Sequence, residues 1–183
     1  MVAIAERAGI DPRTVYKIFG SKVGLLSRLV DVAMVGDQEA IPVMERPWAM
    51  AALDAPTAAE RTSAFALAIR SVMERAGAVF RTAAQAAMAE PEAAALWELG
   101  RRKRQQDAAS FVAALEDASM LRVDRTPMQA AATVWLLTSP ETYLQLTDGL
   151  GWSLDDYERW LEQSLVDALL DPHRRRRRKM SMG

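Results

Sequence analysis

The chain has 183 residues, of which 50% are apolar and 26% charged, and its formal net charge is -1. This composition supports a hydrophobic core in one or two compact domains and excludes wholesale disorder. The lack of cysteine excludes disulfides, thiolate metal sites and a cysteine nucleophile, and a single histidine leaves little for metal or triad chemistry. An enzyme is therefore disfavoured, and we expect no cofactor.

The charges are distributed unevenly. Residues 1–28 carry five basic and two acidic side chains, a run of six basic residues extends from Arg174 to Lys179, and 12 basic and 22 acidic residues lie between. A basic end joined to an acidic body predicts that one part contacts a polyanion. The basic tail either adds non-specific attraction to DNA or is a solvated end without a dedicated role.

No stretch approaches the roughly 20 apolar residues that span a bilayer, and Met1 is not followed by a signal-peptide pattern. The sequence therefore predicts a cytoplasmic chain without membrane association.

Three short helices are predicted in the first 36 residues. The first spans 2–8 and stops at Gly9, and the second begins after the cap Asp11 and runs to about Phe19. Ser21 caps a third, which ends near residue 36. The prolines between 36 and 56 then interrupt the helical pattern, so we place a domain boundary there.

The remaining predicted helices are separated by glycine and proline. A capping box at 57–60 opens a long helix, Gly77 separates it from a shorter helix that stops before Pro91, and another helix runs from Pro91 to about 121. The basic run 101–104 within that helix is interpreted as a solvated face. A helix from 127 breaks near Pro140, and the last begins after the cap at 153 and ends at 172. The sequence thus predicts an all-α fold with domains 1–40 and 41–172 and a tail 173–183.

The first two helices have the features of a helix-turn-helix. Small side chains at Ala5 and Ala8 permit close helix approach, and Gly9 permits a left-handed turn. Ile10, Val15 and Phe19 are expected to pack the second helix on the first. The opposite face of the second helix then exposes a basic, hydrogen-bonding set that can enter the DNA major groove, namely Arg13, Thr14, Tyr16 and Lys17.

These residues closely resemble the TetR family of bacterial one-component transcription regulators. The resemblance is carried by Ile4-Ala5, Ala8-Gly9, Thr14-Val15-Tyr16, Phe19, Ser21-Lys22 and Leu25-Leu26. It covers residues 1 to about 36 and beyond them rests on the all-helical plan, with a further similarity to C-terminal domains of the family around 139–161. It implies an N-terminal helix-turn-helix DNA-binding domain and a C-terminal helical domain for ligand binding and dimerisation.

The resemblance implies a DNA-binding role for five residues. Arg13 is the candidate for reading a base edge, Thr14, Tyr16 and Lys17 for contacting phosphates or bases, and Lys22 for contacting phosphate. Arginine pairs in a bidentate way with guanine, whereas lysine and hydroxyl groups mainly position the backbone. Two alternatives stay open: Tyr16 is a packed aromatic, or Arg13 contacts phosphate.

Two departures from the family pattern concern this region. Ile18 stands where the family often has a polar or aromatic residue, so one DNA contact is expected to be missing. The chain also starts too late for the helix that precedes this motif in the family, so the DNA-binding domain is expected to be incomplete. Ile4, Phe19, Leu25 and Leu29 should then be partly uncovered.

The resemblance further implies a small effector molecule and a homodimer. Candidate effector-pocket residues, for a mostly apolar or aromatic ligand, are Phe65, Met73, Phe80, Met88, Trp97, Phe111 and Trp135. Candidate dimer residues are Trp135, Leu136, Tyr143, Leu146, Leu154, Trp160, Leu161 and Leu165. For both sets ordinary core packing is the alternative.

The sequence is consistent with two functions. The first is a homodimeric repressor that a small molecule releases from its double-stranded DNA operator. The alternative is a helical ligand-binding or interaction protein whose incomplete DNA-binding head binds no operator.

Overall fold

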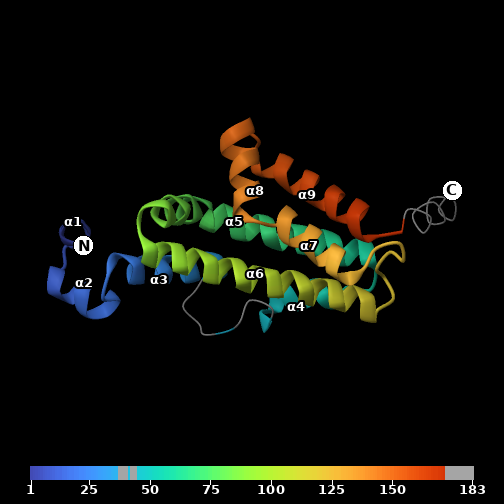
Figure 1. The fold of residues 1–183 in the computed structure, drawn as a ribbon, viewed down its shortest axis with the longest axis horizontal. Coiled ribbons are helices and arrows are strands. Elements are labelled where there is room, and N and C mark those ends of the chain that lie inside the picture. Colours follow the sequence, from blue (N-terminus) through green and yellow to red (C-terminus); the bar gives the residue numbers. More distant parts are fainter. Residues whose placement is uncertain (37–40, 42–44, 172–183) are drawn as a thin grey trace. The chain divides into compact units, whose positions relative to one another are not determined.

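The computed structural model describes residues 1–36, 41 and 45–171 (Figure 1). Over these residues the chain forms nine α-helices and one π-helix, without a strand. The predicted all-α class is confirmed. The basic tail from 173 and most of the stretch between 37 and 44 lie outside the described residues.

The chain divides into two compact units. The first comprises Met1–Glu39 and Arg75–Gly100, and the second comprises Ala40–Glu74 and Arg101–Gly183. The boundaries between the units after residues 74 and 100 fall inside helices. Helices α5 (Ala58–Ala89) and α6 (Pro91–Asp117) therefore each contribute to both units. The domain limits at 40 and 172 stay predictions.

The first unit contains α1 (Val2–Ala8), α2 (Pro12–Phe19) and α3 (Lys22–Val35), with bounds close to those predicted. Its later part is the end of α5 and the start of α6. There the Phe80 and Trp97 rings meet edge to face, with centroids 6.4 Å apart. Ala76, Ala83 and Ala93 are buried in this part of the unit, and such small side chains allow close packing between helices.

The predicted break at Gly77 is wrong. Helix α5 continues through Gly77, which is buried, to Ala89. An interior glycine costs a helix only about 1 kcal/mol relative to alanine, and burial of neighbours such as Ala76 and Phe80 outweighs that cost. The predicted start is confirmed, since the Thr57 and Glu60 side chains each accept a hydrogen bond from the other residue's backbone N–H.

The second unit adds α4 (Pro47–Asp54), α7 (Pro127–Leu137), α8 (Pro140–Leu144), the π-helix η2 (Gln145–Gly149) and α9 (Leu154–Leu169). The predicted caps Thr126 and Ser153 form complete capping boxes, and Ser139 caps α8. Neither α4 nor the π-helix is predicted from the sequence.

The core of the second unit is built on one stripe of α9. Tyr157, Leu161, Leu165 and Leu169 recur every four residues and are fully buried, and α9 packs against α7. Between α5 and α6, the Phe65 and Phe111 rings stack with centroids 3.9 Å apart.

No helix within the described part of the chain combines the length and the apolar character needed to cross a membrane.

Candidate nucleic-acid interface

A left-handed glycine joins α1 to α2. Gly9 has φ 67°, its N–H donates to the Glu6 carbonyl, and the Ile10 N–H donates to the Ala5 carbonyl. These two bonds satisfy carbonyls at the end of α1 in the pattern that a glycine at this position allows. The chain therefore turns within three residues and starts α2 at Pro12.

The start of α2 is fixed by its cap. The Asp11 carboxylate accepts a hydrogen bond of 2.6 Å from the Arg13 backbone N–H, and Pro12 occupies the first helical position. Arg13 is consequently held in the first turn of α2 with its side chain exposed.

A small core holds the two helices together. It consists of Met1 and Ala5 on one side and Val15 on the other, with Phe19 and Leu25 packed against it. Ala5 and Val15 are buried, as the sequence predicts. Ile10, which was expected to help lock α2, remains largely exposed, so that expectation is wrong.

Burial of Val15 directs the opposite face of α2 to solvent. All four residues predicted for this face are exposed: Arg13, Thr14, Tyr16 and Lys17. Tyr16 has 49% of its surface exposed, which disfavours the alternative of a packed aromatic. Ile18, at 64% exposed, is an apolar residue beside this set.

The start of α3 completes the surface. Ser21 accepts a hydrogen bond of 3.0 Å from the Gly24 N–H, and Lys22 is exposed at the first position of α3. Backbone N–H groups at a helix start favour an anion, and an exposed lysine there adds positive charge. The structure thus places the five predicted DNA-binding side chains on exposed positions of α2 and the first turn of α3.

An arginine of α5 secures the other end of α3. The Arg75 guanidinium donates hydrogen bonds to the carbonyls of Ala33 (3.3 Å) and Met34 (2.9 Å). These are among the last carbonyls of a helix, which lack partners within it, and a cation complements the negative end of the dipole. The sequence contains no pattern that identifies this contact, because 41 or more residues separate the partners.

The apolar residues expected to be uncovered differ in their exposure. Ile4 and Leu29 are 47% and 48% exposed, whereas Phe19 and Leu25 are partly buried against the small core.

The candidate effector residues fall in both units. Phe80, Met88 and Trp97 belong to the first, and Phe65, Met73, Phe111 and Trp135 to the second. Met88 is 83% exposed and does not line an enclosed cavity. Phe65 and Phe111 fill their space by stacking on each other, which favours the core-packing alternative for these two.

The basic run in α6 is not a uniformly solvated face. Arg102 and Lys103 are exposed, but Arg101 and Arg104 are partly buried. The Arg101 guanidinium lies 5.4 Å from the centre of the Trp135 ring, a cation–π arrangement. A sequence pattern along one helix cannot reveal a stacking partner on another.

The candidate dimer residues also separate by burial. Leu161 and Leu165 are fully buried within the single chain, which favours the core-packing alternative for these two. Leu136 is exposed, and the other members are partly buried: Trp135, Tyr143, Leu146, Leu154 and Trp160.

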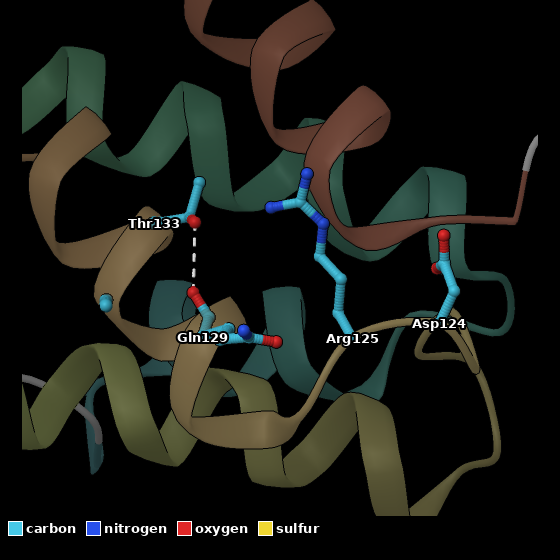
Figure 2. A pocket seen from close by; sticks show the side chains of 5 residues that line it. Asp124, Arg125, Gln129 and Thr133 are labelled. Atoms are coloured by element: carbon cyan, nitrogen blue, oxygen red, sulfur yellow. Dashed lines mark hydrogen bonds between the residues drawn. The ribbon is translucent and has the colours of Figure 1, made fainter.

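A pocket of about 420 Å³ lies at the start of α7 in the second unit, and none of its lining residues belongs to the candidate effector set (Figure 2). In Figure 2 the Arg125 side chain extends from the segment before α7, and the Thr133 hydroxyl donates a hydrogen bond to the Gln129 carbonyl. The lining residues are Asp124, Arg125, Gln129, Ala132 and Thr133.

The Asp124 carboxylate, which lines this pocket, is hydrogen-bonded to the Arg122 side chain. It accepts two hydrogen bonds from Arg122, which hold its pKa below the ordinary value. Arg122 also donates to the Asp167 carbonyl near the end of α9, so this network fastens the loop before α7 to α9. The contacts of these residues thus account for the loop's position.

In the comparisons with known proteins, no protein-family model matches the chain and no curated protein matches it.

Proposed function

We propose that this chain is a DNA-binding transcriptional regulator of the TetR type, most simply a homodimeric repressor released from its operator by a small molecule. The observation that carries the proposal is the surface of α2. Burial of Val15 in the small core and the capped start at Asp11 leave Arg13, Thr14, Tyr16 and Lys17 exposed together.

The proposed interface treats α1 and α2 as a helix-turn-helix with α2 as the recognition helix. Arg13 has the donor geometry to read guanine from the first turn, as recognition helices use their N-terminal residues on base edges. Lys22 would bind phosphate at the start of α3, which positions the protein without reading sequence.

The remaining parts of the proposal rest on the family resemblance and on burial. The dimer surface would include exposed Leu136 and the partly exposed rings of Tyr143 and Trp160. An effector would act by favouring a state in which two DNA-binding heads no longer match half-sites one helical turn apart. A cytoplasmic location belongs to the same proposal.

The test measures binding to DNA from upstream of the protein's own gene, with scrambled duplex as competitor, across a salt series. The three single variants are Arg13→Ala, Lys22→Ala and Lys103→Ala, the last an equal change of charge at an exposed site on α6. Arg13→Ala should lose discrimination at one base position, by about 5- to 150-fold, because a bidentate contact is worth about 1–3 kcal/mol.

Lys22→Ala should weaken binding to every sequence alike and lower the salt slope by about 1, because it removes one phosphate contact. Lys103→Ala should match the wild type. Identical effects of Arg13→Ala and Lys22→Ala would overturn the assigned roles. If the wild type shows no sequence preference, the ligand-binding or interaction protein replaces the regulator, and the half-exposed Ile4 and Leu29 would be its first surface to examine.

A further inference from the structure

The pocket at the start of α7 is accessible from solvent and has the size of a small-molecule site. Its volume is about 420 Å³, which lies within the range of ligand pockets in proteins. Of its lining residues, Thr133 is partly buried and the others are exposed, so a ligand can enter without a rearrangement of the chain. None of the lining residues belongs to the surface assigned to the proposed dimer.

Arg125 provides an uncompensated positive charge in this pocket. Its guanidinium has no hydrogen bond or ion pair with any residue that the structure describes. A guanidinium has five N–H donors in a planar fork that matches a carboxylate, and it stays charged at any physiological pH. The pocket therefore has a cation available for an anionic ligand.

The neighbouring acid does not neutralise Arg125, because Arg122 already pairs with it. The Arg122 Nε and Nη2 groups donate to the two oxygens of the Asp124 carboxylate, and its Nη1 donates to the Asp167 carbonyl at 2.8 Å. In Figure 2 the Arg125 guanidinium extends away from the Asp124 carboxylate. Arg122 thus engages the one acidic side chain that lines the pocket and leaves Arg125 for a ligand.

Gln129 supplies a second donor. Its Oε1 accepts a hydrogen bond of 3.2 Å from the Thr126 N–H in the capping box of α7, which fixes the amide group. The NH₂ group of the same amide has no partner within the described part of the chain and can donate to a ligand. The Gln129 N–H is bonded to the Thr126 hydroxyl, so side chains supply the donors of this site and the end of the helix does not.

The other two lining residues supply no donor. The Thr133 hydroxyl donates to the Gln129 carbonyl at 3.0 Å, and the Ala132 side chain is a methyl group. The pocket therefore combines one free positive charge and one amide donor with apolar surface.

We propose that this pocket binds a small monocarboxylate, with the Arg125 guanidinium pairing with the carboxylate and the Gln129 amide donating to it. A single free guanidinium balances one negative charge, whereas a phosphate at neutral pH carries up to two, and the second would face the Asp124 carboxylate. The planar fork of arginine also matches the planar carboxylate. The inference goes beyond the proposed function, because it does not depend on whether the chain binds DNA.

The test compares benzoate with benzamide, which has the same ring and no charge. Both are titrated into the isotope-labelled full chain at pH 7 and constant ionic strength, and amide chemical shifts report affinity and location. We expect benzoate to bind about tenfold more tightly than benzamide, in keeping with a charge-assisted pair at a site open to solvent. The shifted amides should lie within residues 122–133.

Arg125→Ala should weaken benzoate binding about tenfold, to the level of benzamide, and leave benzamide binding unchanged. The variant should keep the thermal midpoint of the wild type, because the Arg125 side chain is exposed and bonds to no other part of the described chain. Arg7→Ala is the matched control, since it removes the same charge from an exposed position of α1 in the other unit and should keep the affinity for benzoate.

Four results would overturn the site. These are equal affinities of the wild type for the two compounds, wild-type benzoate affinity in Arg125→Ala, an equal loss in Arg7→Ala, or shifts confined to other parts of the chain. Phenyl phosphate is titrated in the same way. If it binds more tightly than benzoate, the assignment of a carboxylate ligand is wrong. None of these measurements uses DNA, so failure of this site is distinguishable from failure of the DNA-binding proposal.

Discussion

Asp107 on α6 illustrates how a single residue's surroundings decide the sign of its effect. Burial raises the pKa of its carboxyl above 3.8, although Arg104 and Lys103 act in the opposite direction. The folded chain therefore holds this proton more tightly than the unfolded chain. The contribution of Asp107 to the free energy of unfolding therefore falls as pH rises from about 4 through the folded pKa. At neutral pH the buried carboxylate is charged, and its burial still lowers the stability of the folded chain.

Asp107→Asn should consequently raise the thermal midpoint at pH 7, because the amide avoids the cost of a buried charge. The gain should disappear below the ordinary carboxyl pKa of 3.8, where the wild type is also uncharged. Thermal unfolding at pH 3.5, 5 and 7 checks this. Asp117→Asn, at an exposed position of the same helix, controls for the loss of charge. A gain that is equal at all three pH values would contradict the argument.

At the scale of elements, two arginine side chains connect helices that lie far apart along the sequence. Arg75 holds the end of α3, and Arg70 pairs with Glu74 of α5 and with Asp155 and Glu158 of α9. Arg70 thereby joins α5 to the first turn of α9 within the second unit. The contacts of Arg75 with α3 and of Arg70 with α9 bridge residues far apart along the chain, so no local pattern predicts them.

The contact between α2 and α3 gives the sharpest prediction at this scale. A Cβ on Gly24 would lie 2.1 Å from the Phe19 carbonyl oxygen, so the backbone itself must move. Gly24→Ala should destabilise the packing of α2 on α3 by about 1–3 kcal/mol, as overpacking does. Faster hydrogen exchange of α2 amides would report the change.

Gly149→Ala is the control for that experiment, since a Cβ there meets nothing within 4 Å. If Gly24→Ala left the α2 amides as protected as in the wild type, the close approach would not constrain these helices.

At the scale of the whole molecule, the proposed homodimer depends on apolar surface that the single chain leaves open. Leu136 near the end of α7 is 59% exposed. Leu136→Lys would place a charge in the proposed interface, where an unpaired charge costs several kilocalories per mole if buried. We expect the molar mass of the sedimenting particle, measured by sedimentation velocity, to shift from that of a dimer towards that of a monomer.

Met128→Lys is the matched control, because Met128 is exposed on the same helix but lies outside the candidate dimer set. The sedimenting particle of this variant should keep the molar mass of the wild-type particle. A monomeric wild type, or a dimer unaffected by Leu136→Lys, would exclude this surface as the interface.

Local chemistry made much of the fold predictable. The caps at Asp11, Ser21 and Ser153 and the turn at Gly9 determine where helices start and stop, because they satisfy backbone groups through contacts within a few residues. The period of apolar residues likewise indicated which face of α2 would be exposed. The exposure of the four candidate DNA-binding residues on α2 was therefore predictable, whereas the role of all five candidates in binding DNA stays a prediction.

Tertiary packing decided what remained. It carried α5 through Gly77, placed Arg101 over the Trp135 ring and buried Leu161 and Leu165. It also enclosed the Tyr157 hydroxyl, which has no acceptor among the residues that the structure describes. Each outcome depends on atoms that are distant in sequence and close in space. The sequence by itself thus determined the helices and their polar and apolar faces, because those follow from interactions within a turn or two. Only the tertiary structure decided which faces meet, because burial and pairing depend on contacts between helices.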